Sequence, residues 1–171
     1  MKNRLHKIAF GGGCHWCTEA VFQSLKGVEK VEQGFVSSID EHTAFSEAVI
    51  LHFNSETIDL RVLLEIHLHT HKSRSNHSMR KKYRSAVYVF DMSQKEEVAR
   101  LMDDFQIVYK GELVTKVLQF NAFKPSEKQF QNYYAKNSEK PFCKRYINPK
   151  LKLLQKQFSR HMHTKNKSHQ S

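Results

Sequence analysis

Hydrophobic and polar residues alternate along parts of the chain with the two-residue period of a strand that buries one face. The clearest alternation runs from Phe45 to Phe53, where Glu47, Val49 and Leu51 share a face with the two phenylalanines. Short apolar or alternating runs predict four further strands. The predicted strands span residues 6–10, 28–36, 45–53, 83–90 and 113–120.

Other stretches repeat their apolar residues every three or four positions, which is the period of an amphipathic helix. The clearest begins at Ser93, which forms a capping box with Glu96, and ends at Gly111. Its apolar stripe consists of Val98, Leu101, Met102, Phe105 and Tyr109. The predicted helices span residues 14–26, 60–71, 93–111, 125–137 and 149–158.

This mixture of strands and helices predicts a sheet with helices packed on it, in the α+β or α/β class. The length of 171 residues suits one domain, which we assign to residues 1–158, followed by a basic, flexible tail over residues 159–171. Mean hydropathy is -0.63, and no apolar run approaches the roughly 18 to 20 residues that cross a bilayer. We therefore expect a soluble protein without membrane contact.

Three cysteines in a chain of this length are too few for a disulfide-stapled secreted scaffold, and they suit a reducing compartment. The basic N-terminal residues are followed by glycines and not by the apolar segment of a secretory signal. Both features predict a cytoplasmic protein.

The formal net charge of +11 would by itself favour a polyanionic partner such as nucleic acid. Nine of these charges, however, follow Glu139, after which the chain has no acidic residue. Such a charge run is usually a solvated face, and this one contains few aromatic residues to stack on bases. We expect only weak, nonspecific polyanion binding by the basic tail.

The stretch Gly11–Glu19 is the strongest candidate for a reactive site, because a glycine run precedes Cys14 at the start of a predicted helix. Backbone amides and the positive end of the helix dipole favour the thiolate of such a cysteine, which is its reactive form. Cys17 lies one helical turn further on, as in Cys-x-x-Cys redox pairs. The alternative is a pair of small buried residues, but the glycines, the helix start and the second cysteine together favour reactivity.

The segment from Gly13 to Phe22 resembles the active-site segment of the peptide methionine sulfoxide reductase A family, whose GCFWG or GCFWC motif reads GCHWC here. Further similarities follow in the same order over most of residues 6–158. They are Gly34-Phe35, Ser46-Glu47-Ala48-Val49, Leu63-Leu64 with His71, Tyr83-Arg84-Ser85-Ala86-Val87-Tyr88, Phe123-Lys124-Pro125-Ser126-Glu127, Pro141-Phe142-Cys143 and Pro149-Lys150.

The resemblance implies a two-layer α+β sandwich of ferredoxin-like plait type, with helices packed on a mixed or antiparallel sheet. It also implies a thiol mechanism that needs no metal or organic cofactor. In that mechanism the Cys14 thiolate attacks the sulfur of methionine-S-sulfoxide, free or in an oxidised protein, and becomes a sulfenic acid as methionine leaves. A second thiol condenses with it, and thioredoxin, or dithiothreitol in vitro, reduces the disulfide. The implied role is protein repair in the oxidative stress response, and we expect a monomer.

Several further site residues follow from the resemblance. Glu47 matches the acid that protonates the sulfoxide oxygen, and apolar neighbours on its strand face would keep its carboxyl protonated near neutral pH. Tyr83 matches the tyrosine that hydrogen-bonds this oxygen. Trp16 matches half of the aromatic pocket for the substrate methyl group. The alternatives are an exposed strand end for Glu47 and core positions for Tyr83 and Trp16.

Two cysteines are candidates for the resolving thiol. Cys143 matches the recycling cysteine of many members and is our first choice, because family precedent favours a C-terminal thiol that swings in. Cys17 occupies the matching position of the GCFWC variants, but a disulfide between Cys14 and Cys17 would strain a helical turn. The alternative for Cys17 is packing beneath the motif helix.

Three departures from the family pattern affect the substrate pocket. His15 replaces the second aromatic residue of the methyl pocket, and its imidazole can stack but is polar and titrates. The family's second oxygen-binding tyrosine has no match between Phe35 and Glu47. The Gly-Asn-Asp loop before Tyr83 is replaced by the basic residues 76–82, whose charge either stabilises the Cys14 thiolate or is solvated.

Other function classes compete with this one, since a divergent member with altered or lost activity would act as a thiol redox, metal-binding or nucleic-acid-binding protein. A zinc site would combine the cysteine pair with His67, His69 and His71, but only His67 and His71 share a helix face and no second Cys-x-x-Cys exists. A thioredoxin-type fold places a cis-proline before a late strand, whereas the three prolines here all follow the last predicted strand.

Overall fold

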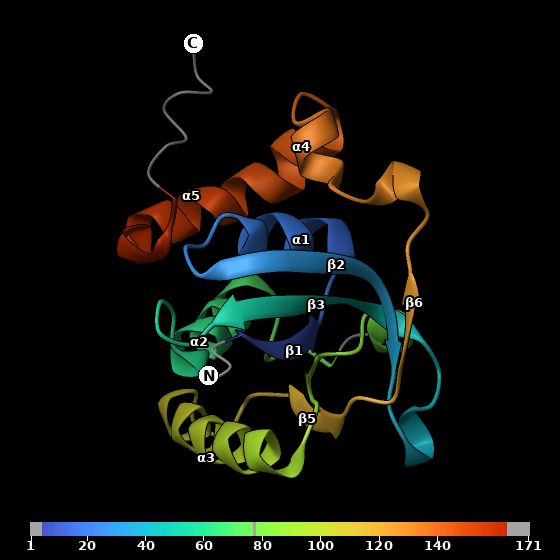
Figure 1. Cartoon of the computed structure of the whole chain (residues 1–171), viewed down its shortest axis with the longest axis vertical. Helices are drawn as coiled ribbons and strands as arrows, with labels where there is room; N and C mark the ends of the chain where they lie inside the picture. Colours follow the sequence, from blue (N-terminus) through green and yellow to red (C-terminus); the bar gives the residue numbers. More distant parts are fainter. Residues whose placement is uncertain (1–4, 77, 164–171) are drawn as a thin grey trace.

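The computed structural model describes residues 5–76 and 78–163, and within them six strands form one sheet (Figure 1). The strands are β1 (Leu5–Gly11), β2 (Val28–Ser37), β3 (Ser46–Asn54), β4 (Ala86–Val89), β5 (Lys116–Gln119) and β6 (Ala122–Pro125). Their order across the sheet is β5-β4-β1-β3-β2-β6. Every neighbouring pair is antiparallel except β4 and β5, which are parallel.

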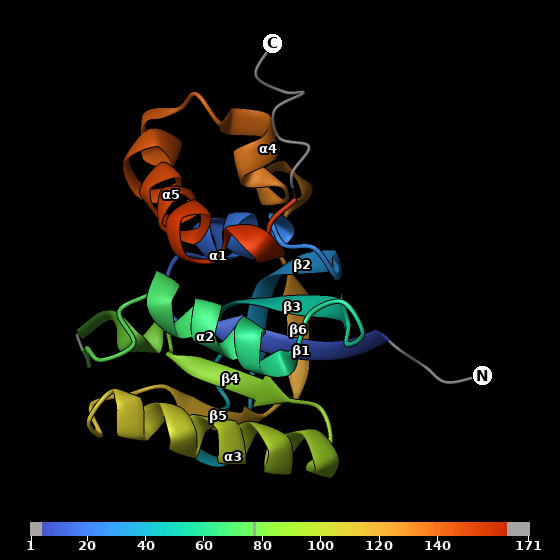
Figure 2. The ribbon, with the colours of Figure 1, turned by 90° about the vertical axis from the view of Figure 1, so that its left-hand side faces the viewer.

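The α-helices are α1 (His15–Gln23), α2 (Leu60–Thr70), α3 (Met92–Val108), α4 (Tyr133–Asn137) and α5 (Asn148–Gln157). A π-helical turn over Cys143–Ile147 leads into α5. Figures 1 and 2 both place α1 between α5 and the sheet, while α3 lies beside β4 and β5 at the other end of the molecule. The start of α1 is therefore covered by the C-terminal helices.

The first four strands and first two helices form a ferredoxin-like plait, because β1-α1-β2-β3-α2-β4 has the central strand order β4-β1-β3-β2. The larger hydrophobic core joins one face of this sheet to the helices, for example Phe10 and Leu51 to Phe22 and Leu63. A smaller core around Tyr88 covers the other face. The α+β class and the two-layer architecture expected from the sequence are confirmed.

Some element boundaries differ from the sequence prediction for local physical reasons. Helix α3 begins at Met92 and not after Ser93, because the Asp91 side chain caps it by accepting the Gln94 amide at 2.8 Å. Phe45 precedes β3 and is 46% exposed, so the alternation that includes it overstates the strand. Tyr83 lies in a turn before β4, where its amide donates to the Met79 carbonyl.

The predicted helix over residues 125–137 is wrong in its first half. Residues 122–125 pair with β2 as the edge strand β6, a 3-10 turn follows at Lys128–Phe130, and only Tyr133–Asn137 is α-helical. A short polar segment has little periodicity, so its pairing with a distant strand is invisible in the local pattern.

The C-terminal end of the domain packs against α1. Ser159–His161 form a 3-10 turn, and Met162 is buried and bridges to Leu25. The rest of the predicted tail, residues 164–171, lies outside the described residues. Within the described part of the chain, no helix is long and apolar enough to cross a membrane.

Candidate active site

Cys14 stands at the junction of β1 and α1, where the chain must turn sharply. It is the N-cap of α1, with an extended backbone (φ -60°, ψ 127°), and its side chain is half-buried. Gly12, two residues earlier, has a positive φ and lies so close to the His71 ring that a Cβ would collide with it. This close approach holds the glycine loop and sets the place of Cys14 at the helix start.

The Cys14 and Cys17 side chains lie together on the wall of one small cavity. The pKa of Cys14 is lowered, first by side-chain hydrogen bonding to Cys17 and then by the Trp16 and Cys17 amides, against the effects of burial and the Glu47 charge. The pKa of Cys17 is raised, first by the bond to Cys14 and then by burial. Of the two thiols, Cys14 is therefore the one that ionises more readily.

Glu47 faces the start of α1 from β3 and is 8% exposed. Its Oε1 accepts the His15 amide at 3.1 Å and lies 3.6 Å from Nε2 of the same residue. Lys82 Nζ is 3.9 Å from Oε2. The prediction that this carboxyl has apolar surroundings is therefore wrong. Glu47 lies on the core-facing side of the strand, but its carboxylate has polar partners.

Tyr83 and Lys82 form the other wall of this site. The Lys82 ammonium lies 5.2 Å from the centroid of the Tyr83 ring. A hydrogen bond to the Tyr83 side chain, followed by the charges of Tyr83, Glu47 and Cys14, raises the pKa of Lys82. The turn before β4 thus brings Lys82 within electrostatic reach of both Glu47 and Cys14, with Tyr83 beside Lys82.

Arg80 anchors that turn and is a residue that sequence reasoning missed. Its guanidinium donates to the carbonyl oxygens of Gly12 (3.0 Å), Tyr83 (2.7 Å), Lys72 (2.6 Å) and Ser75 (2.9 Å). The basic loop is therefore partly ordered by an internal cation and not simply solvated. Only the replacement of the family's Gly-Asn-Asp loop by basic residues signals this change in the sequence.

His15 is buried beside Glu47 and does not line an open pocket. Its Nδ1 donates to the Gly34 carbonyl at 2.7 Å, and its ring meets the edge of Phe35 at 5.1 Å. Because His15 is only 6% exposed, its imidazole contacts the Glu47 carboxylate and offers little surface to a substrate methyl group.

Trp16 belongs to an aromatic cluster next to the cysteines. Its ring stacks on Tyr133 at 3.9 Å and meets Phe142 edge-on at 5.2 Å. These three side chains pack partly buried against the Cys17 and Cys143 cluster. Sequence reasoning identified Trp16 but not Tyr133, whose only signal is the density of aromatic residues after Lys128.

Glu19 holds this aromatic cluster together and was also missed. Its carboxylate is 1% exposed and accepts the amides of Asn132 (2.9 Å) and Tyr133 (3.1 Å), together with the Gln33 side chain (2.9 Å). A carboxylate so deeply buried is retained only when it is fully hydrogen-bonded. The signal in the sequence is a glutamate within the buried face of the motif helix.

Cys143 lies in the π-helical turn before α5 and is fully buried. It packs with Cys17, Ala20 and Ile147, and burial raises its pKa. All three cysteines are free thiols. The structure therefore brings both resolving candidates together, with Cys17 in contact with Cys14 and Cys143 beside Cys17.

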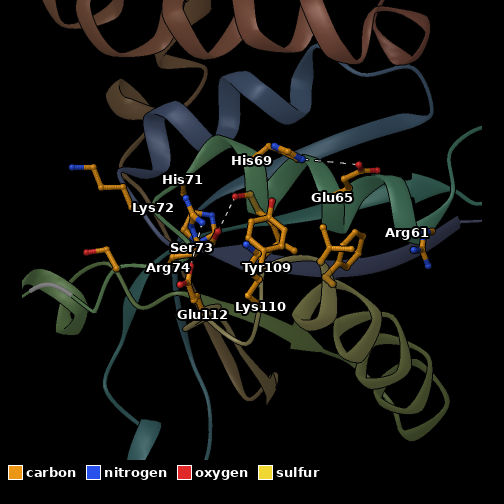
Figure 3. A pocket seen from close by; sticks show the side chains of 14 residues that line it. Arg61, Glu65, His69, His71, Lys72, Ser73, Arg74, Tyr109, Lys110 and Glu112 are labelled. Carbon is orange, nitrogen blue, oxygen red and sulfur yellow. Dashed lines mark hydrogen bonds and ion pairs between the residues drawn. The ribbon is translucent and has the colours of Figure 1, made fainter.

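The histidines of α2 do not assemble with the cysteines into a metal site. His71 is hydrogen-bonded to Ser85 Oγ (2.8 Å), while His69 is exposed and lies 4.0 Å from Glu65. Figure 3 shows His69 on the wall of a groove of about 1010 Å³ between α2 and the end of α3, where Arg74 pairs with Glu112. Over residues 5–76 and 78–163, no three His, Cys, Asp or Glu side chains converge as metal ligands.

Comparison with known proteins identifies the family. The sequence profile described as peptide methionine sulfoxide reductase matches residues 6–163. The chain belongs to this family. A protein of Chromobacterium violaceum named peptide methionine sulfoxide reductase MsrA is 33% identical over an alignment of 171 positions, and the match covers 91% of this chain and 97% of that protein.

Solved structures with the same fold are known. Mxr1 from Saccharomyces cerevisiae in its reduced form has a TM-score of 0.73 at 19% identity, over 82% of this chain and 90% of that one. Mxr1 in complex with Trx2 has a TM-score of 0.61 at 19% identity, over 74% and 84% of the two chains. The family resemblance and its fold are thus confirmed, across the same part of the chain that carries the motifs.

Proposed function

We propose that this enzyme is a peptide-methionine (S)-S-oxide reductase in which the Cys14 thiolate is the nucleophile. The observation that carries the proposal is the position of Cys14 at the N-terminus of α1, with Cys17 on the wall of the same cavity and Glu47 bonded to the first amide of the helix. A thiolate, an acid and a second thiol are the three groups that sulfoxide reduction requires.

The substrate sulfoxide would lie between the aromatic cluster and the Glu47 wall. In the proposed step, Cys14 attacks the sulfoxide sulfur while Glu47, entering the step as the carboxylic acid, gives its proton to the oxygen and becomes the carboxylate that Lys82 faces. The Tyr83 hydroxyl donates a hydrogen bond to the same oxygen. Trp16 packs against the methyl group, and His15 positions the Glu47 carboxylate from behind. Methionine leaves, and Cys14 carries the oxygen as a sulfenic acid.

The geometry favours Cys17 over Cys143 as the first resolving thiol. Cys17 lies beside Cys14 on the wall of the same small cavity, and the extended backbone of Cys14 frees that residue from the helical geometry that would strain the disulfide. Cys143, packed beside Cys17, would then exchange with the first disulfide. This order replaces our first choice of Cys143 for the initial step.

We propose a thioredoxin-like protein as the physiological reductant, supported by the yeast relative whose structure holds Trx2. The substrates are oxidised proteins or free methionine sulfoxide, and the reaction needs no metal or organic cofactor. Three free thiols suit a reducing, cytoplasmic compartment. A monomeric state and weak polyanion binding by the basic C-terminus complete this proposal.

The test is the reduction of S- and R-methionine sulfoxide, free and in a peptide, with dithiothreitol as reductant. Wild type should reduce the S epimer only, and Cys14→Ser should be inactive. Wild-type inactivity towards both epimers would overturn the proposal.

A further inference from the structure

A small cavity of about 40 Å³ lies between the start of α1, the end of α2 and the first turn of α5. Its wall includes both sulfurs of the motif, Cys14 and Cys17, together with His67, Thr70 and Lys150. The proposed reaction uses the two cysteines but assigns nothing to the other three residues.

Lys150 is the cationic side chain of this cavity wall. Its ammonium donates to the Thr70 carbonyl oxygen, which ties α5 to the C-terminal end of α2. In the described part of the chain, this carbonyl is its one hydrogen-bond acceptor, although an ammonium has three N–H groups. Burial lowers the pKa of Lys150, and the charges of Cys17 and Cys14 oppose that effect.

The other titratable residues of the cavity do not supply positive charge at neutral pH. Burial lowers the pKa of His71 to about 4 and that of His67 well below its ordinary value. Lys72 and Arg80 lie further out and act on Lys150 and His71 as like charges. The nearest cation to the cysteine pair within the cavity is therefore Lys150.

Formation of the disulfide requires Cys17 to ionise, which most of its surroundings oppose. Cys17 must lose its proton to attack, yet its hydrogen bond to Cys14 and its burial raise its pKa. The Lys150 charge acts in the opposite direction and lowers the pKa of Cys17. Once Cys14 is a neutral sulfenic acid, the thiolate that held the Cys17 proton no longer exists.

We propose that Lys150 activates Cys17 as the resolving nucleophile, because its ammonium stabilises the thiolate that attacks the Cys14 sulfenic acid. This inference rests on the proposed function. In the step, a bond forms between the two sulfurs and the Cys14 sulfur–oxygen bond breaks. The leaving hydroxide takes the proton that Cys17 gives up and departs as water, so the step needs no external oxidant or reductant.

The experiment separates the two chemical steps in a single turnover without reductant. Methionine release measures oxygen transfer, and a sulfenic-acid trap such as dimedone, followed by mass spectrometry, measures how long the Cys14 sulfenic acid survives. In Lys150→Met, we expect methionine release within about twofold of wild type and a sulfenic acid that survives roughly tenfold longer, since loss of a nearby charge commonly changes a pKa by about one unit. Lys150→Arg should restore the wild-type lifetime.

Two further variants separate charge from structure. Lys152→Met removes an exposed lysine from the same helix and should behave as wild type. Lys150→Gln can still donate to the Thr70 carbonyl but is neutral, so it should share the long sulfenic-acid lifetime, and it serves as the test variant if Lys150→Met does not fold. An unchanged lifetime in a folded neutral variant would overturn the role of Lys150. Absence of methionine from the wild type would overturn the proposed function instead.

Discussion

Cys14 becomes reactive through neighbours that lie within a few residues of it. The Cys17 thiol and two backbone amides lower its pKa, whereas the Glu47 charge raises it. The interactions that lower the pKa could be predicted from the local sequence, because a Cys-x-x-Cys spacing at a helix start implies a nearby thiol and free backbone amides. The opposing Glu47 comes from a different strand, and its polar partners were not predictable from strand alternation.

Glu47→Gln should affect the two properties of the site in opposite directions. Loss of the acid should lower kcat for methionine-S-sulfoxide by about 100-fold or more. Loss of the negative charge should also lower the pKa of Cys14, so iodoacetamide should alkylate Cys14 faster at pH 7. Glu41→Gln, an exposed position, is the control. Slower alkylation of the Glu47→Gln variant would contradict this account of Cys14.

The helix α1 joins elements that are far apart in the chain. Through Glu19 it holds the start of α4, and through Trp16 it supports the aromatic cluster. Helix periodicity predicted the buried face of α1, but it contains no information on which distant segment covers that face. For this reason the sequence led to Trp16 and the cysteines but not to Tyr133.

Glu19→Ala should loosen α4 from α1. It leaves two backbone amides and the Gln33 side chain without their buried acceptor, so we expect a loss of about 3 kcal/mol in the free energy of unfolding. Urea denaturation measures this loss. Trp16 is the single tryptophan, so its fluorescence should also report separation from Tyr133 in the folded protein.

Glu29→Ala, at an exposed position, is the matched control and should change neither quantity. Unchanged stability and fluorescence in Glu19→Ala would show that the Glu19 hydrogen bonds do not hold α4.

At the scale of the whole molecule, the alternating pattern and the helical stripes predicted a sheet with helices packed on it, in the α+β or α/β class, and the family resemblance selected α+β. The apolar stripe of α3 and the core-facing side of β3 both lie where the pattern predicts them. The edge strand β6 and the cap of α3 escaped prediction because pairing partners and competing caps depend on tertiary contacts. Arg80 and Lys150 escaped for the same reason, since each has an acceptor at least 68 positions away in the chain, Gly12 for Arg80 and Thr70 for Lys150.

Acid should destabilise the fold through its buried histidines. The pKa of His71 is about 4 in the folded chain against an ordinary value of 6.5, so between these values the unfolded chain binds the extra proton. Stability is therefore fully present above pH 6.5 and falls as pH decreases towards 4. Between pH 7.5 and pH 5 we expect His71 to account for a loss of about 2 kcal/mol.

Urea denaturation at the two pH values measures this loss. His71→Gln should reduce the difference, whereas His69→Gln, on the exposed side of α2, should leave it unchanged. An equal difference in wild type and His71→Gln would rule out this residue as the source.

The three cysteines of the site are an odd number, so they cannot all be paired in disulfides within one molecule. Whichever two of Cys14, Cys17 and Cys143 form a disulfide, the third remains a thiol, so internal oxidation never consumes the last one. Cys17 and Cys143 are buried, and only Cys14 has appreciable exposure. In this conformation a bulky reductant can reach a disulfide that contains Cys14, whereas a disulfide between Cys17 and Cys143 is buried at both sulfurs.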